Sequence, residues 1–453
     1  MTQLIAPAPR PSPLAPRPYQ FPRFHRGALD NGIRLVVAPV RKAPLVSITA
    51  VFEAGATADP VDGSGLAQLT ARLLLEGTDA LDGGALAERF EMIGASVDAH
   101  ADWDVALVSV TALTERIDEA FHLIGDVLTT PSFPEREVER LKAERAADIM
   151  QLRTEPRALA DEAFDRVVYE DGSRFALPAG GTLEHVRAIT RDDVRAFYEA
   201  RYRPAGLTLI VAGDIDVDAA TALAARVLGG WQGTEVPYVP VVDRPGRATR
   251  AVHVVTKSDA PQTELRIGHV GTSRRTPDYF AVVVMNAILG GLFSSRINLN
   301  LREANGFTYG AFSGFDWRRQ AGPFAVSTAV KTEVTAAAVR EVLSEIDRMR
   351  SAPVEASELS LATSYLDGVF PIRYETTDAI AAALTNLVIY DMADDWFDTY
   401  RERVRAVTAA DVLDAAQRYL KPDELQVVAV GDPATIRGEL EQLGVGPVTD
   451  HVV

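Results

Sequence analysis

Histidine, aspartate and glutamate are the side chains here that could hold a metal ion, because the sequence contains no cysteine. A metal site needs ligands at fixed spacings, so that they converge about 2 Å from one ion. No two histidines lie four residues apart as a pair on one helix face, so we expect each to be a surface or hydrogen-bonded core residue. The seven histidines are His25, His100, His122, His185, His253, His269 and His451.

Other catalytic signatures are also missing from the sequence. It has no G-x-S-x-G serine elbow, no G-x-x-x-x-G-K-[ST] phosphate loop and no strand-coupled G-x-G-x-x-G. The absence of cysteine excludes thiol nucleophiles, disulfides and iron–sulfur clusters. An acidic run could be imagined as a metal-binding face, but such runs are usually a solvated helix face. Its members are Asp391, Asp394, Asp395 and Asp398.

Two segments remain in which residue types and spacing could serve chemistry. Gly65–Thr78 reads GLAQLTARLLLEGT, which predicts a helix over about 65–75 with Gly77 as its C-cap. Gly290–Tyr309 reads GGLFSSRINLNLREANGFTY. Here Arg302 falls in the last turn of a predicted helix, where a cation suits the dipole, and Asn305-Gly306 supplies the cap.

Tyr309 begins an alternating stretch that predicts a strand over 308–317. The helix end and the strand start can therefore direct the Arg302 guanidinium and the Tyr309 phenol to one point. The alternative is an arginine that caps its own helix and a tyrosine half-buried on a sheet.

Both segments resemble the pitrilysin-like inverzincin peptidases, a family that includes mitochondrial processing peptidase and insulin-degrading enzyme. In active chains of that family the first segment carries H-x-x-E-H on a helix. The flanks Gly65-Leu66-Ala67 and Gly77-Thr78 match the family pattern and set the register. The resemblance spans roughly residues 26–445.

In this register at least three of the family's four catalytic positions have lost their usual residue. The two zinc-binding histidines fall on Gln68 and Arg72, and the general base falls on Ala71. The third ligand, a glutamate about 76 residues further on, falls on or near Asp148. An arginine would add positive charge where the ion should sit, and an alanine cannot move a proton. The resemblance therefore implies that this chain binds no zinc in the family manner and hydrolyses no peptide alone.

The second segment matches the family's substrate-side motif. In paired members the non-metal chain contributes an arginine and a tyrosine seven residues apart, which correspond to Arg302 and Tyr309. The resemblance implies that both hydrogen-bond to backbone carbonyls of a peptide, and that the tyrosine helps to stabilise the oxyanion.

An internal repeat organises the chain. Thr190–Asp214 reads TRDDVRAFYEARYRPAGLTLIVAGD, and Thr408–Asp432 reads TAADVLDAAQRYLKPDELQVVAVGD. They align without a gap, and each unit predicts a capped helix, a proline stop and a buried strand. The chain is therefore expected to contain two copies of one domain.

The predicted fold class is α+β, with two homologous domains that each have a mixed or antiparallel sheet and helices packed on one face. We expect a flexible proline-rich arm over 1–23, domains over 24–231 and 251–453, and a Pro/Gly-rich linker over 232–250. Asp30-Asn31-Gly32 predicts a hairpin turn within 27–40. Further strands are predicted over 45–52 and 105–112, and further helices over 85–93, 116–128, 136–151 and 155–169.

Amino-acid composition limits the classes of partner and the cellular location that we expect for the chain. With 46 basic and 63 acidic residues the net charge is −17, which argues against nucleic acid. No stretch reaches about 18 consecutive apolar residues, so no membrane span is expected. Residues 1–23 lack the apolar core of a signal peptide, and we expect a cytoplasmic protein, or a periplasmic one if a leader has been removed.

The resemblance implies a non-catalytic, substrate-binding subunit of a heterodimeric zinc metalloendopeptidase. A homologous partner with an intact H-x-x-E-H motif would supply the zinc and the general base, and peptides would be the substrates. No cofactor is expected in this chain. Three alternatives stay open: a catalytically inert scaffold of the same fold, a homodimeric peptide-binding module, and an unrelated carboxylate-metal hydrolase.

Overall fold

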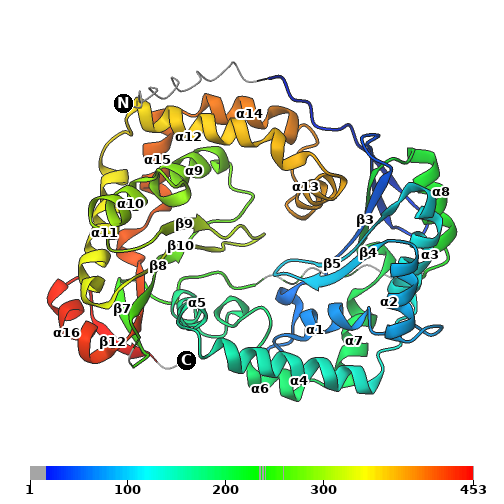
Figure 1. Cartoon of the computed structure of the whole chain (residues 1–453), viewed down its shortest axis with the longest axis horizontal. Coiled ribbons are helices and arrows are strands. Elements are labelled where there is room, and N and C mark those ends of the chain that lie inside the picture. Colours follow the sequence, from blue (N-terminus) through cyan, green and yellow to red (C-terminus); the bar gives the residue numbers. More distant parts are fainter. Residues whose placement is uncertain (1–16, 234–235, 237–238, 240, 259, 452–453) are drawn as a thin grey trace, which may run out of the picture.

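The computed structural model describes residues 17–233, 236, 239, 241–258 and 260–451. Within these residues the chain forms two halves, each built on one six-stranded sheet (Figure 1). The strands of the N-terminal half are β1 (His25–Ala28), β2 (Arg34–Pro39), β3 (Leu45–Phe52), β4 (Ser96–Ala101), β5 (Ala106–Leu113) and β6 (Leu207–Gly213). Its helices are α1 (Leu66–Leu73), α2 (Gly83–Met92), α3 (Ile117–Thr129), α4 (Glu135–Leu152), α5 (Pro156–Val168), α6 (Leu183–Ala188), α7 (Arg191–Arg201) and α8 (Val217–Leu228).

The C-terminal half has the same architecture. Its strands are β7 (Ala251–Thr256), β8 (Gln262–Val270), β9 (Ala311–Phe315), β10 (Pro323–Lys331), β11 (Gln426–Gly431) and β12 (Val448–His451). Its helices are α9 (Tyr279–Asn286), α10 (Arg296–Asn298), α11 (Thr335–Ser351), α12 (Ala356–Val369), α13 (Thr377–Ile389), α14 (Trp396–Ala406), α15 (Ala409–Tyr419) and α16 (Pro433–Leu443). Two π-helical turns, Ala287–Gly291 and Leu299–Ala304, flank α10.

The two sheets share one topology. Their strand orders are β1-β2-β6-β3-β5-β4 and β12-β7-β11-β8-β10-β9. In each sheet one strand from the start of the half pairs in parallel with the strand of the repeat unit, and the next pairings are antiparallel. The mixed sheets confirm the predicted α+β class. Only the outermost strand differs, because β1 pairs antiparallel with β2 whereas β12 pairs parallel with β7.

The sequence repeat corresponds to α7–β6 in one half and α15–β11 in the other. The third residue of each helix is an aspartate. Its backbone N–H donates to the side chain of Thr190 or Thr408, and its carboxylate accepts the backbone N–H of that threonine in return. These reciprocal capping boxes satisfy backbone donors that a helix start leaves free. The strands that follow are buried throughout and occupy the third position of their sheets.

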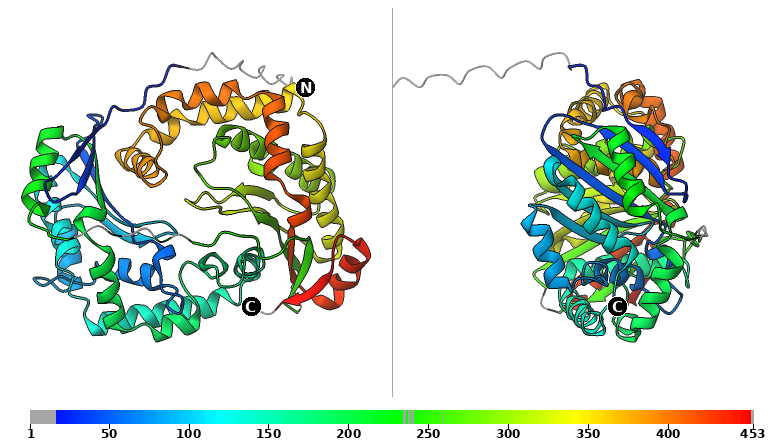
Figure 2. Two further views of the ribbon diagram at one scale, coloured as in Figure 1. Left: turned by 180° about the vertical axis from the view of Figure 1, so that it is seen from behind. Right: turned by 90° about the vertical axis from the view of Figure 1, so that its right-hand side faces the viewer.

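Each half sends one helix onto the sheet of the other. Helix α5 packs on β8 and β11, and α13 packs on β3 and β6. In Figures 1 and 2 both helices lie between the two sheets, while helices such as α4, α8, α11 and α12 run around the outside. Polar contacts hold the exchange, because Arg266 Nε donates to Asp161 at 2.6 Å and Ser47 Oγ contacts Thr377 Oγ1 at 2.8 Å. The prediction of helices on one face therefore holds for the helices that stay with their own sheet. On the opposite face of each sheet, one helix of the other half packs on two strands.

Several boundaries differ from the predictions. Helix α1 ends at Leu73 with Leu74 as its cap, so Gly77, whose φ is +140°, lies beyond the helix and is not its C-cap. Strand β9 begins at Ala311, so Tyr309 precedes the strand instead of opening it. Strand β4 was not predicted, because its polar residues weaken the alternation; pairing with β5 fixes it.

The described part of the predicted N-terminal arm is packed, which corrects its reading as a flexible segment. Phe21 is buried and stacks on Phe397 at 4.0 Å between ring centroids. The carbonyl of Arg17 accepts the Arg401 guanidinium at 2.8 Å. Residues 1–16 lie outside the described residues.

The segment Tyr279–Ala304 is long and apolar enough to span a membrane by length and composition alone, although no span was expected. Half of its most apolar window is buried inside the C-terminal half. Val282, Val284 and Met285 are fully buried members of that half's core. Their burial accounts for the apolar composition.

Candidate functional site

The positions that the resemblance assigns to the metal site lie where α1 packs against α4. Asp59 fixes the start of α1, because its carboxylate accepts the N–H groups of Gly65 at 2.8 Å and Ala67 at 2.7 Å. The buried carboxylate also pairs with Arg174 at 2.8 Å. Gly65 has φ +97°, and a Cβ there would lie 2.9 Å from the carbonyl oxygen of Gly180. The start of α1 and the loop before α6 therefore pack too closely for any side chain at Gly65.

An arginine-rich cluster occupies these positions. Arg72 is half-exposed and forms an ion pair with Glu144 of α4 at 3.2 Å. Arg145, one residue on, donates from Nε to the carbonyl of Gly180 at 2.9 Å. Burial lowers the pKa of Arg145, which the carboxylate of Asp148 opposes and the charge of Arg72 reinforces.

Gln68 lies in the same cluster, because its Oε1 and the Arg145 guanidinium both lie over Gly180. Ala71 is fully buried in the core of the N-terminal half.

This donor set does not fit zinc. An amide, a methyl group and a guanidinium stand at the ligand and base positions, and a second guanidinium lies beside Asp148. Two cations would repel a divalent ion, and Ala71 offers no atom that can exchange a proton. Within the described ranges no group of three or more His, Cys, Asp or Glu residues could hold a metal ion. This also holds for the acidic run that begins at Asp391, in which Asp394 forms an ion pair with Arg26 at 2.7 Å.

The structure brings Arg302 and Tyr309 together. Arg302 lies in the π-helical turn at the end of its helix, as predicted, and the N–H of Asn305 donates to its carbonyl. Its guanidinium carbon lies 5.3 Å from the centroid of the Tyr309 ring and 4.3 Å from that of Phe293. Tyr309 is 90% exposed and Phe293 is 70% exposed. The tyrosine is therefore not half-buried on the sheet, as the alternative reading required.

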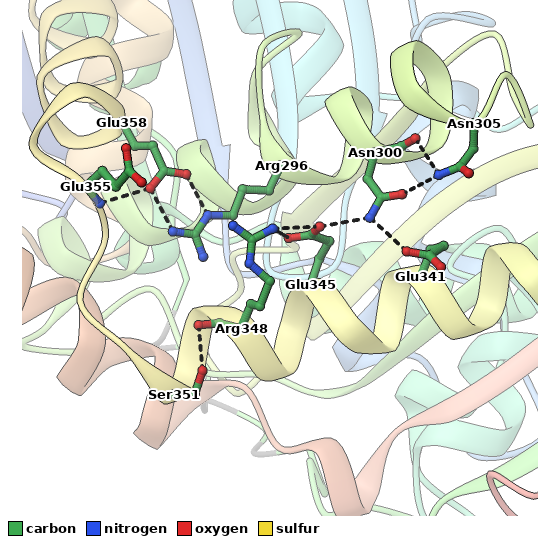
Figure 3. A network of polar contacts seen from close by, with 9 residues as sticks. All are labelled: Arg296, Asn300, Asn305, Glu341, Glu345, Arg348, Ser351, Glu355 and Glu358. Carbon is green, nitrogen blue, oxygen red and sulfur yellow. Dashed lines mark hydrogen bonds and ion pairs between the residues drawn. The ribbon is translucent and has the colours of Figure 1, made fainter.

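A polar network anchors the segment that carries Arg302 (Figure 3). Arg296 forms a two-point ion pair with Glu358 of α12, at 2.6 and 2.7 Å. Asn300 donates to Glu341 and Glu345 of α11 at 3.0 and 2.9 Å, and Asn305 donates back to Asn300. Residues 296–305 are therefore fixed on two helices, and this gives Arg302 a well-anchored support.

Sequence reasoning missed two members of these clusters. Phe293 stands in the quoted segment, but only the fold shows its ring under the Arg302 guanidinium. Arg145 gave no signal beyond its place on the same helix as Asp148. Its role depends on the loop at Gly180, which is 35 residues away in sequence.

Family comparisons agree with this fold. Residues 35–174 match the family described as insulinase (peptidase family M16), and residues 188–366 match the peptidase M16 inactive domain. The chain belongs to peptidase family M16. The inverzincin resemblance seen in the sequence is thereby confirmed.

Individual relatives have low sequence identity to this chain but align over most of its length. An uncharacterized zinc protease of Rickettsia felis is 23% identical over 72% of this chain and 78% of its own length. The mitochondrial-processing peptidase subunit beta of Saccharomyces cerevisiae is 22% identical over 92% of this chain and 93% of its own. A crystal structure described as a peptidase M16 inactive domain from Pseudomonas fluorescens superimposes with a TM-score of 0.85, at 24% identity, over 90% of this chain and 98% of that one.

Proposed function

We propose that this chain is the non-catalytic, substrate-binding subunit of a heterodimeric zinc metalloendopeptidase. One observation carries the proposal: Gln68, Ala71 and Arg72 stand where the resemblance expects the metal site, whereas Arg302 and Tyr309 are adjacent and the tyrosine is exposed. A homologous partner with an intact H-x-x-E-H motif would supply zinc and base. The similarity to a chain named as a peptidase subunit supports the subunit part of this proposal.

The chain's own residues would bind and orient the peptide. The Arg302 guanidinium offers several N–H donors to backbone carbonyls, and the Tyr309 hydroxyl offers one more. The ring of Phe293 restricts the guanidinium from one side. The Figure 3 network keeps the supporting turn fixed, so binding a peptide orders few additional side chains.

The test compares variants of this chain in complex with a candidate partner that carries H-x-x-E-H. Arg302→Ala or Tyr309→Phe should lower kcat/KM for peptide hydrolysis about tenfold, because each removes hydrogen bonds to substrate. Zinc content, measured by elemental analysis, should not change. Arg437→Ala and Tyr365→Phe remove side chains of the same types from sites outside the Arg302–Tyr309 pair and should leave turnover unchanged.

Three results would contradict the proposal. Equal turnover by wild type and both variants would remove Arg302 and Tyr309 from substrate binding. A partner that copurifies without peptidase activity would favour an inert scaffold. Zinc and turnover in the isolated chain would show that the register at Gln68, Ala71 and Arg72 is wrong.

A further inference from the structure

A cavity of about 250 Å³ lies in the C-terminal half, away from both clusters described above. It opens between α9, α13, α14 and the short 3₁₀ helix Pro371–Tyr374. Most of its wall is aromatic: Tyr279, Trp317, Tyr374, Tyr390, Trp396, Phe397 and Tyr400. The other lining residues are Arg274, Arg373, Ala383, Asn386 and Met392. Among the described residues no aspartate or glutamate lines it.

Arg274 is the central feature of this cavity. The residue is 8% exposed, and its guanidinium carbon lies 3.5 Å from the centroid of the Tyr279 ring. Trp396 and Tyr390 lie further out, at 5.1 and 5.8 Å. Nη2 donates to the thioether sulfur of Met392 at 3.1 Å, and a thioether is a weak acceptor.

Comparison with the other buried arginines shows what Arg274 lacks. Within the described part of the chain four arginines are buried, and the remaining three each form an ion pair with an aspartate. Those pairs are Arg266–Asp161, Arg318–Asp316 and Arg401–Asp367, at 2.5 to 2.6 Å. No carboxylate of the described residues pairs with Arg274, and burial lowers its pKa, which the neighbouring tyrosines oppose only in part. Burying a cation without an anion costs free energy, so a negatively charged ligand would stabilise this site.

We propose that this cavity binds a small organic carboxylate, whose oxygens pair with the Arg274 guanidinium. Because the Tyr279 ring covers one face of the guanidinium, its N–H groups point sideways, where a carboxylate can accept two of them. The exposed Arg373 adds a second positive charge at the cavity. The aromatic walls suit an apolar or aromatic body better than a hydrated inorganic ion.

The volume limits the ligand to roughly the size of one amino-acid residue, since pockets for larger molecules span about 300–1,000 Å³. Two sources share this chemistry: a free small acid, and the C-terminal residue of a peptide. This inference does not depend on the proposed peptidase role, because none of its residues belongs to the Arg302–Tyr309 cluster.

Calorimetric titration of the full chain tests the charge requirement. N-acetylphenylalanine should bind at least ten times more tightly than N-acetylphenylalanine amide, and it should change the fluorescence of the two lining tryptophans. Benzoate and N-acetyl-Ala-Ala-Phe separate the two sources: tight binding of benzoate alone points to a free acid, and tight binding of the tripeptide acid points to a peptide end. Equal affinity for acid and amide, or binding of none of these probes, would overturn the proposal. Preferential binding of inorganic phosphate would overturn the organic-carboxylate assignment.

Variants test the assignment to Arg274. Arg274→Gln should weaken binding of N-acetylphenylalanine at least tenfold, and Ala383→Leu should do the same by filling the cavity without removing a charge. Arg403→Gln is the matched control, because Arg403 also stacks on a ring, Phe280 at 5.5 Å, but lies outside the cavity. If Arg274→Gln does not fold, Ala383→Leu and Arg373→Gln decide. Unchanged affinity in folded Arg274→Gln, or in Ala383→Leu, would contradict the site.

Discussion

A single buried histidine makes the stability of the folded chain depend on pH. His269 on β8 is 1% exposed, its Nδ1–H donates to the carbonyl of Val270 at 2.9 Å, and its Nε2 accepts the N–H of Lys421 at 3.1 Å. Both ring nitrogens are therefore committed to the neutral form. Burial lowers the pKa of His269 to about 4.

This predicts a specific loss of stability in acid. As pH falls below about 6.5 the unfolded chain takes up a proton that folded His269 refuses, so its contribution decreases until pH reaches about 4, by up to about 3 kcal/mol. Urea unfolding at pH 7.5 and pH 5 measures the change. His269→Gln should reduce the difference between the two pH values, whereas His122→Gln, an exposed histidine on α3, should not. Identical pH dependence in wild type and His269→Gln would contradict this account.

At the scale of elements, the two capping boxes are equivalent. Thr190 and Thr408 each accept an aspartate N–H at 3.2 Å, and each threonine N–H donates back to that aspartate at 2.8 Å. The helices they start, α7 and α15, lead into the central strands β6 and β11. Each capping box therefore fixes the start of the helix that precedes a central strand of its half.

Removing either cap should have a similar cost. Thr190→Ala and Thr408→Ala should each lower the free energy of unfolding by about 1 kcal/mol, and the double variant by about 2, since the sites are far apart. Chemical denaturation measures both. Thr399→Ala, within α14 and away from any cap box, should not destabilise comparably. A cost confined to one site would show that the two units are not energetically equivalent.

At the scale of the whole molecule, the exchange of α5 and α13 joins the halves. Asp161 on α5 binds Arg266 of the opposite sheet, and Asp378 on α13 accepts hydrogen bonds from Ser47 and Thr111. Each sheet therefore completes its buried face with a helix from the other half. Neither half can unfold without exposing a sheet face of its neighbour.

We therefore expect the two halves to unfold in one cooperative transition. The four tryptophans allow a direct measurement, because Trp103 and Trp231 lie in the N-terminal half and Trp317 and Trp396 in the C-terminal half. Replacing either pair by phenylalanine leaves fluorescence that reports on one half. The two urea midpoints should coincide in variants of matched stability. Midpoints that differ, with a plateau between them, would contradict the coupling.

The sequence predicted the features that depend on residues close together in the chain. The capping threonines, the turn at Asn31-Gly32 and the buried runs of β3, β6 and β11 act over a few residues, so their patterns predicted those elements. The repeat then predicted two similar domains, and the spacing of Arg302 and Tyr309 placed both at one helix end. Strand β4 was missed because its residues favour a strand only when β5 is beside them.

Other features required the tertiary structure, because they join residues distant in sequence. The exchange of α5 and α13, the Arg145 contact at Gly180 and the aromatic surroundings of Arg274 all depend on which faces meet. Sequence alone determined which side chains are present at the metal positions. Only folding decided that Arg72 would pair with Glu144 and that buried Arg274 would have no acidic partner among the described residues, since burial and pairing are properties of neighbours in space.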